Sequence, residues 1–411
     1  RTYKSCKDDS SANAPKNDGD ECWAGQVLTL SLNGESTAIV YDAGSKTFRP
    51  VQDDSTTKIE DLTGTTNGTD NGEYFKVTEN GVKYYFGWNR LPGWSSGKEE
   101  TKSAWTVPVY KAHDGVSDCP AGTDFASSSC TLGYRFNLDY VVDRHGNAMA
   151  YYYAPETGYY GPNMKNDAVA YTRGGTLKRI DYGMTSSTVY SGTAPEQILF
   201  DATAERCISG TPSGNTCSDS QFTKSNPEYW PDVPIDLNCA KDATDCTNHG
   251  PSFWSRKRLT SITTQVQVGG ATKQVDRYDF TQSFPDGGDH APTLWLDSIK
   301  RTGLDLLGGA SAGTSTPSVS FDPPLQLANR VGTIPQMPRM YHDRIQTVTT
   351  ETGAQTTVAY DTPDCSSAPA SDPNDPTDAA AKGFASTNTL RCFPVYWTPD
   401  GQPSPMLDWF Y

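Results

Sequence analysis

Apolar and polar residues alternate along this chain in short runs that are separated by turn residues. In the segment 342–361 the run passes through Ile345, turns at Gly353, and returns through Val358 to Asp361. Alternation with a period of two places successive side chains on opposite faces of a β-strand, and glycine accepts the positive φ of a tight reversal. The segment is therefore predicted to be a β-hairpin.

Two further hairpins are predicted around Asn-Gly pairs. The runs 27–41 and 74–88 alternate on both arms and carry Asn33-Gly34 and Asn80-Gly81 at their tips. Asn-Gly favours the type I′ turn that joins two antiparallel strands directly. These segments have the strongest local signals in the chain.

The remaining segments are predicted with weaker signals. Residues 104–110 form a strand that Pro108 places at a sheet edge, and 134–142 form a strand that returns over 148–154. Residues rich in Gly, Pro, Asn and Asp predict long coil at 155–175 and 207–256. Short helical turns are expected at 325–330 and 376–385, so the protein is predicted to be nearly all β.

A more specific pattern occurs four times in the second half of the chain. An apolar-x-x-apolar strand is followed, after a turn or loop, by a strand that ends in an aromatic residue and an aspartate. The four pairs are Phe200-Asp201, Tyr278-Asp279, Phe321-Asp322 and Tyr360-Asp361. We expect each ring to pack on a neighbouring hairpin and each carboxylate to accept N–H groups of the next turn.

These strand, turn and aromatic-Asp units resemble the YD repeat of the Rhs proteins, a family that includes bacterial polymorphic toxins, the C subunits of Tc toxins, and teneurins. Segments 80–87 and 140–153 are similar to the region before the repeats in large secreted actinobacterial Rhs proteins, and the resemblance covers most of residues 20–411. It implies an array of hairpins that spirals into a hollow shell around a cargo, commonly a C-terminal toxin of the same polypeptide.

The same resemblance implies a non-catalytic scaffold with no cofactor, whose partners are the rest of its polypeptide or an associated shell chain, together with the enclosed cargo. The family's self-cleavage motif and a toxin domain have no counterpart here. We expect three regions: a polar N-terminal tail (1–20), a hairpin-rich pre-repeat region (21–175), and an irregular repeat region (176–411). The fold is predicted as all-β, with successive antiparallel hairpins forming a curved sheet held by local disulfides.

Ten cysteines fall as near neighbours in sequence and bracket polar loops. Their spacing lacks the CxxC pairs of zinc sites, so we predict local disulfides and an oxidising, secreted or cell-surface location. The predicted pairs are Cys6 with Cys22, Cys119 with Cys130, Cys207 with Cys217, Cys239 with Cys246, and Cys365 with Cys392. The alternative is a cytosolic protein with free thiols.

Net charge and hydropathy exclude two classes of partner. The formal charge is −15 with a pI near 4.7, and no basic run is present. Nucleic-acid binding needs a basic stripe, so we expect no nucleic-acid partner. No apolar run is long enough to cross a bilayer. The strand pattern of residues 405–411, which lacks a closing turn, suggests that the natural polypeptide continues beyond it.

Catalytic motifs are sparse. Residues 93–97 match GxSxG with Ser95 at its centre, but they lie between hairpins, outside the strand–turn–helix context that the motif needs. The five histidines occupy loops and turns without metal-binding spacing, and they are His113, His145, His249, His290 and His342. No catalytic or metal-ligating residue is therefore assigned.

Four acidic clusters could gather oxygen ligands for Ca²⁺, although none has the full EF-hand pattern. They are Asp18–Glu21, Asp70–Glu73, Asp286–Asp289 and Asp372–Asp375. We expect them to be solvated turns and leave a structural calcium ion open.

Two other functions remain open. The first is a secreted carbohydrate-active enzyme or glycan-binding module, in which two facing carboxylates and stacked rings would line a concave pocket. The alternative role of the tryptophans is to pack loops and cap sheet faces; they are Trp88, Trp94, Trp105, Trp230, Trp254 and Trp295. The second is an adhesion surface whose exposed loops bind another protein.

Overall fold

The computed structural model describes the chain except for residues 43, 45–46, 52–56, 117–118, 211–213, 290, 305–312, 331–338, 362–390, 392, 398–405 and 411. The described residues divide into two compact units, Arg1–Tyr278 with Thr302–Thr314, and Asp279–Arg301 with Ser315–Tyr411. Regular structure in them consists of strands and short 3-10 turns, with no α-helix. The prediction of an all-β, antiparallel fold with local disulfides is confirmed.

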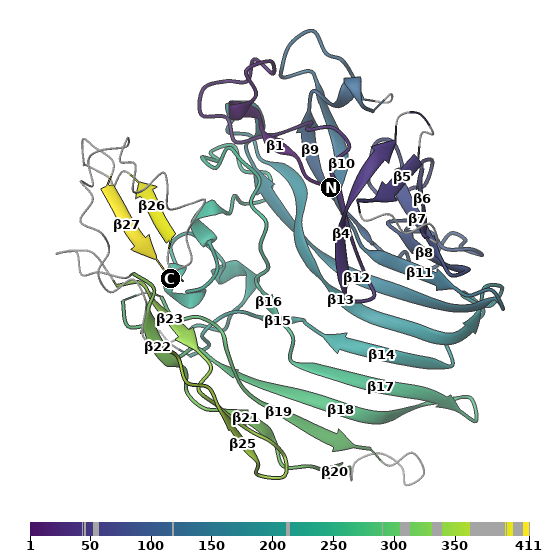
Figure 1. Ribbon diagram of the computed structural model, residues 1–411, viewed down its shortest axis with the longest axis vertical. Coiled ribbons are helices and arrows are strands. Elements are labelled where there is room, and N and C mark those ends of the chain that lie inside the picture. Colours follow the sequence, from purple (N-terminus) through teal and green to yellow (C-terminus); the bar gives the residue numbers. More distant parts are fainter. Residues whose placement is uncertain are drawn as a thin grey trace. The chain divides into compact units, whose positions relative to one another are not determined.

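The first unit contains one large antiparallel sheet (Figure 1). Consecutive hairpins build it, so the order of the strands in space follows their order in the chain. The strands, in sheet order, are β3 (Leu28–Leu32), β4 (Glu35–Asp42), β5 (Thr47–Pro50), β6 (Thr57–Leu62), β7 (Tyr74–Glu79), β8 (Val82–Phe86), β11 (Leu138–Val142), β12 (Asn147–Tyr160), β13 (Val169–Thr185), β14 (Glu196–Asp201), β17 (Ser261–Val268) and β18 (Ala271–Ser283). The first unit includes β18 as far as Tyr278.

Both Asn-Gly turns form as predicted. Asn33 and Gly34 have φ of 54° and 84°, and Asn80 and Gly81 have φ of 51° and 80°. Positive φ at both central positions defines the type I′ turn, which matches the twist of the strands it joins. The resulting hairpins pair β3 with β4 and β7 with β8.

A second, four-stranded sheet lies in the same unit. Its order is β1 (Lys4–Ser5), β2 (Glu21–Cys22), β9 (Ala104–Tyr110) and β10 (Ser129–Phe136). β2 runs parallel to β9 and pairs with it at Val109 and Tyr110. The edge position predicted for β9 is therefore wrong, because β2 pairs with the part of β9 that follows Pro108.

The strand predicted over 134–142 is divided between the two sheets. β10 ends at Phe136 and β11 begins at Leu138, so Asn137 is the point at which the chain passes from one sheet to the other. Its backbone N–H and side-chain amide both donate to the Ser103 carbonyl, at 2.8 and 2.9 Å. The Gly87 N–H donates to the carbonyl of Asn137 at 3.0 Å. These bonds fix the break.

The coil predicted over 155–175 is wrong, because β12 and β13 extend through most of it. Their ladder passes Pro155 and the glycines by shifts of register, one of them between Glu156 and Thr157. Gly158 is required there, since a Cβ would lie 2.9 Å from the ring of Tyr171.

The long coil at 207–256 is present as predicted, with three 3-10 turns, η4 (Asp219–Gln221), η5 (Pro227–Tyr229) and η6 (Ile235–Leu237). Short strands β15 (Ala204–Glu205) and β16 (Lys257–Arg258) pair at its base.

The second unit is also made of antiparallel strands. β19 (Trp295–Gly303) pairs with β21 (Val319–Phe321), β21 with β24 (Thr347–Thr349), and β24 with β25 (Gln355–Thr357). A two-stranded ribbon joins β22 (Leu325–Ala328) to β23 (Tyr341–Arg344), so the helical turn expected at 325–330 is wrong. The expected helix at 376–385 lies outside the described residues. β26 (Phe393–Trp397) and β27 (Met406–Phe410) form a hairpin, and β20 is the two-residue strand Thr314–Ser315.

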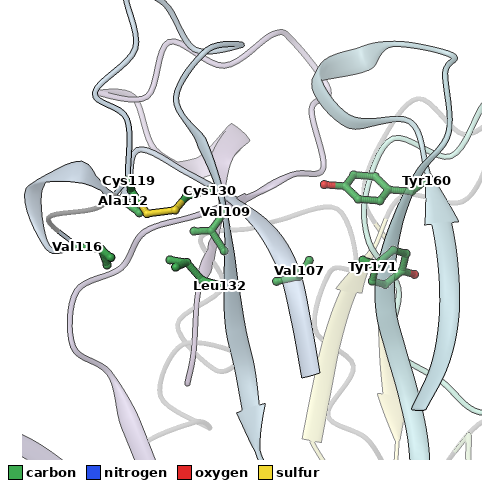
Figure 2. Close-up of a cluster of buried hydrophobic side chains, with 9 residues drawn as sticks. All are labelled: Val107, Val109, Ala112, Val116, Cys119, Cys130, Leu132, Tyr160 and Tyr171. Atoms are coloured by element: carbon green, nitrogen blue, oxygen red, sulfur yellow. A yellow bond between two sulfur atoms is a disulfide. The ribbon is translucent and has the colours of Figure 1, made fainter. Parts of the chain in front are cut away.

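In the part of the chain that the structure describes, five clusters of buried apolar side chains form the core, and these lie between residues 6 and 254. Figure 2 shows one, in which Val107, Val109 and Leu132 of the four-stranded sheet are fully buried beside the Cys119–Cys130 disulfide. Tyr160 of β12 and Tyr171 of β13 complete it, with their rings packed edge to face. This cluster joins the two sheets of the first unit.

Candidate functional site

The GxSxG motif lies in an exposed loop between β8 and β9. The Ser95 carbonyl accepts the backbone N–H of Lys98 at 3.0 Å, and Trp94 donates its N–H to the Lys98 carbonyl. The guanidinium of Arg90 stacks over the Trp94 ring at 4.0 Å. The loop is thus a self-contained turn, and it lacks the strand-to-helix geometry that exposes a nucleophilic serine.

The described histidines lie on separate elements of the chain. The N–H of His145 donates to Asp143 in a turn, and Nδ1 of His249 lies 3.0 Å from the Gly161 carbonyl. His113 lies in the 3-10 turn η2 (Ala112–Asp114), His342 lies on β23, and His290 is outside the described residues. Among described residues, no three metal-binding side chains come together.

The first acidic cluster differs from the expected solvated turn. Asp18 and Asp20 are fully buried. Asp20 accepts hydrogen bonds from the hydroxyl of Tyr160 and the N–H of Asn163, both at 2.6 Å. Burial raises the pKa of Asp20 to about 7. The local sequence could not reveal this burial, since the partner Tyr160 is 140 residues away.

The carboxylates of the other described acidic clusters accept backbone N–H groups, some from distant parts of the chain. Asp70 accepts the Thr131 N–H at 2.7 Å, and Asp289 accepts the N–H groups of Met340 and Tyr341 at 2.9 and 3.0 Å. Asp286 accepts the Gly288 N–H at 3.1 Å. The cluster Asp372–Asp375 lies outside the described residues. Whether any cluster holds calcium stays a prediction.

Four disulfides link the cysteines in sequence order, as predicted: Cys6–Cys22, Cys119–Cys130, Cys207–Cys217 and Cys239–Cys246. The pair Cys365 and Cys392 lies outside the described residues. Two of the four bridges hold the coil 207–256, where Cys207 packs with the buried Trp230. Disulfides of this kind are compatible with an oxidising compartment. Among the described residues there is no helix with the length and apolar content that a membrane crossing requires.

The aromatic-Asp pairs lie at or near strand ends, but they do not share one role. Asp201 accepts the Thr203 N–H at 3.2 Å and its hydroxyl at 2.7 Å, which is the predicted turn contact and lowers the pKa of Asp201. Asp361 instead forms an exposed ion pair with Arg391 at 3.3 Å. The Tyr360 hydroxyl donates to the Ile345 carbonyl across the hairpin. Phe200, Tyr278 and Phe321 lie within β14, β18 and β21. A common repeat function for the pairs stays a prediction.

Four of the tryptophans singled out from the sequence, Trp88, Trp105, Trp230 and Trp254, pack against other side chains. Trp88 stacks on Tyr85 with ring centroids 4.5 Å apart, and Trp254 lies 3.8 Å below the guanidinium of Arg173. Trp230 is 1% exposed, and Trp105 meets Tyr153 edge to face. These contacts are those of packing residues.

One cavity of about 530 Å³ lies in the first unit, over the apolar side chains of β3–β8. Its walls combine aliphatic and aromatic side chains with a few polar groups, and no carboxylate lines it. Two facing carboxylates would mark a glycosidase. The cavity therefore does not match the carbohydrate-active alternative.

The most distinctive surface of the first unit is the sheet formed by β13, β14 and β17, because its two faces differ. On one face, here called the ladder face, Asp181 accepts from Arg179 at 2.8 Å and from Gln197 at 2.7 Å, and Gln265 donates to Gln197 at 2.5 Å. These hydrogen bonds cross three neighbouring strands. No sequence signal pointed to the ladder, because each of its residues alone is an ordinary polar position of a strand.

The opposite face, here called the apolar face, carries Ile180, Ile198, Phe200, Ile262 and Val266. Register places Ile180 beside Ile198, and Phe200 beside Ile262. All five side chains are half-buried, and none belongs to any of the five core clusters. Within the described residues this face is therefore not packed against a core cluster, whereas Asp181, Gln197 and Thr263 on the ladder face are buried.

Comparisons with known proteins give structural matches at low similarity. No family model and no curated sequence matches the chain. Two matches are structures of TcdB2-TccC3-Cdc42 and TcdB2-TccC3-TEV, which are 13% and 12% identical with TM-scores of 0.33 and 0.34. They cover 74% and 75% of this chain, which spans 13% of the length of each of those chains.

A third match is the N-terminal domain of the effector protein SpvB from Salmonella typhimurium strain LT2. It is 13% identical with a TM-score of 0.32, over 68% of this chain and 75% of that chain. Similarity at this level carries no argument about function.

Proposed function

We propose that this chain is a β-walled scaffold, a segment of a secreted shell that encloses a polypeptide cargo and has no catalytic role. The observation that carries the proposal is the sheet β13–β14–β17, whose polar face is hydrogen-bonded and buried and whose apolar face is only half-buried. A sheet whose apolar face is not packed against a core cluster of its own chain can cover another polypeptide with that face.

The apolar face is the side that we assign to the cargo. Contiguous apolar surface on a folded protein marks an interaction site, because covering it removes apolar area from water. An unfolded or partly folded polypeptide exposes apolar side chains that this face would cover. The resemblance of the hairpin array to YD repeats supports the same role.

Accessibility of the two faces tests this proposal. Ile198→Cys and Leu199→Cys place a thiol on the apolar and ladder faces at neighbouring positions of β14, where both native side chains are half-buried. Each variant is labelled with a bulky maleimide in the isolated chain and in the assembly from the native source. We expect labelling at position 198 to be lost in the assembly, while labelling at 199 changes little.

Equal labelling of both positions in the isolated chain and in the assembly would contradict a wall. The carbohydrate-active and adhesion alternatives predict that result, since neither requires either face of β14 to be covered. If position 198 is protected instead, mass spectrometry of the assembly would identify which polypeptide lies against the sheet.

A further inference from the structure

The acidic segment 18–21 lies where three parts of the first unit meet. It belongs to the N-terminal tail of the chain. Its Asp20 carboxylate accepts the hydroxyl of Tyr160, the last residue of β12, at 2.6 Å. The neighbouring Gly19 N–H donates to the His249 carbonyl in the long coil at 3.0 Å. The segment therefore connects the tail to the sheet and to the coil.

Two carboxylates of this segment are buried, and one of them has no partner. Asp18 and Asp20 are both 0% exposed. Asp20 has two donors, the Tyr160 hydroxyl and the Asn163 N–H. Both oxygens of Asp18, in contrast, are buried without a hydrogen-bond partner among the described residues. A buried carboxylate is costly unless it is hydrogen-bonded, paired with a cation or bound to a metal ion.

The two carboxyl groups also act on each other. Burial and, to a smaller extent, the charge of Asp18 raise the pKa of Asp20 to about 7, against the lowering effect of its hydrogen bonds. Burial raises the pKa of Asp18 as well, and outweighs the nearby groups of Asp20 and the charge of His249, which lower it. Two adjacent buried carboxylates repel each other, and a cation between them removes this repulsion.

The chemistry of the pair favours a hard cation. Carboxylates are preferred ligands of Ca²⁺, which takes about six to eight oxygen atoms in a flexible shell that also includes main-chain carbonyls and water. In the described part of the chain no third histidine, cysteine or acidic side chain completes a group with the pair, so the ligand set does not suit zinc. Cys6 and Cys22, which flank the segment, form a disulfide and offer no thiolate.

We propose that Asp18 and Asp20 bind one Ca²⁺ ion, which holds the N-terminal tail against the end of β12 and the long coil. The ion supplies the partner that the Asp18 carboxylate lacks, and water and main-chain oxygens complete its shell. This site is independent of the apolar face of β13–β17.

Thermal unfolding of the whole chain, after treatment with EDTA, tests for the ion. We expect CaCl2 at about 10 mM to raise Tm by about 3 °C or more, because a ligand that binds only the folded state stabilises it. MgCl2 at the same concentration should raise Tm less, since Mg²⁺ gives up its water reluctantly. Equal Tm values in CaCl2 and EDTA overturn the proposal. If Tm then also falls as the pH rises through about 7, the pair holds a proton instead.

Two neutral substitutions locate the ion. Asp18→Asn removes one ligand, and the control Asp8→Asn removes the same charge from an exposed position of the same tail. Asp18→Asn should lose the rise of Tm in CaCl2, and its Tm in EDTA should equal or exceed that of wild type, because the repulsion between the two carboxylates is gone. Asp8→Asn should respond to CaCl2 as wild type does. A response that survives Asp18→Asn unchanged overturns the assignment to this pair.

Hydrogen exchange of the wild-type chain locates the ion even if Asp18→Asn does not fold. We expect CaCl2, compared with EDTA, to slow exchange in the three segments that meet at the pair, 16–22, 160–165 and 246–250. Exchange in β14 and β17 should not change. Slower exchange elsewhere, with no change in these three segments, would place the ion at another acidic cluster and overturn the proposal.

Discussion

The first unit stabilises its strands in two different ways. In the four-stranded sheet, Val107, Val109 and Leu132 are fully buried in a cluster that extends to β12 and β13. In β14 and β17, by contrast, apolar side chains are half-buried, and the buried residues are polar ones such as Gln197 and Thr263. The first region depends on apolar burial, and the second depends on backbone pairing and cross-strand hydrogen bonds. A sheet of the second kind keeps its polar side chains buried and leaves its apolar side chains only half-buried.

Truncation of an apolar side chain should show the largest difference between the regions. Leu132→Ala is expected to lower the free energy of unfolding by about 2–5 kcal/mol, because it leaves a cavity in a close-packed cluster. Ile262→Ala on the apolar face should lower it by only about 1 kcal/mol. Urea unfolding of the two variants measures this difference. Equal losses of unfolding free energy in the two variants would show that the apolar face is packed as tightly as the core. The two regions would then be stabilised in the same way.

The free energy of unfolding should depend on pH through a buried carboxylate that lies outside β14 and β17, that of Asp139. Asp139 is fully buried, and its Oδ2 accepts from the N–H of Asn89, the hydroxyl of Thr101 and the hydroxyl of Ser103. Burial, which outweighs these hydrogen bonds, raises the pKa of Asp139 from 3.8 to about 6. The folded protein therefore binds this proton more tightly than the unfolded chain does. The resulting contribution to the free energy of unfolding is complete below the unfolded-state pKa of 3.8, and it is lost as the pH rises through about 6.

We expect the loss to be on the order of 2 kcal/mol between pH 4 and pH 7. Asp139→Asn should flatten that part of the profile in urea unfolding measured at a series of pH values. A wild-type profile that rises over this interval and is unchanged in the variant would contradict the assignment to Asp139.

Removal of a ladder residue should have an intermediate effect. Gln197→Ala deletes the donor to Asp181 and the acceptor of Gln265, so we expect a loss of about 1–2 kcal/mol. Hydrogen exchange should localise the loss to β13, β14 and β17. Exchange that rises equally in β9 and β10 would show that the two regions unfold together.

The aromatic-Asp pairs should show the smallest effects. Asp201→Ala removes two hydrogen bonds to Thr203 and should cost about 1 kcal/mol. Asp361→Ala removes only an exposed ion pair with Arg391, for which we expect at most about 0.5 kcal/mol. Thermal unfolding of the two variants, compared with wild type, ranks them. A larger loss of stability in Asp361→Ala than in Asp201→Ala would support a common structural role for the repeat aspartates.

Sequence reasoning succeeded where the information is local. Asn33-Gly34 and Asn80-Gly81 determine their turns through their own φ values, and near-neighbour cysteines pair across short loops. It failed where the local structure depends on residues that are distant in the sequence. The break at Asn137 depends on Ser103, the burial of Asp20 depends on Tyr160, and the neighbour of β9 is a two-residue strand at Glu21–Cys22.

The candidate surface was predictable only in part. The aromatic-Asp pattern predicted a strand that ends at Phe200-Asp201, but not that Gln197 would link Asp181 to Gln265, because that contact requires the register of three strands. The cavity was not predicted either. Its wall combines β3–β8 with Phe136 and Leu138, which lie on either side of the break at Asn137.

That break also has a mechanical consequence. β10 and β11 are consecutive stretches of one backbone, separated by a single residue that is anchored to Ser103. Tension along β11 therefore passes directly into β10, where it acts parallel to the strands and loads several ladder hydrogen bonds at once. Shear of this kind resists extension better than unzipping from an end, so the two sheets of the first unit should yield to force as one element.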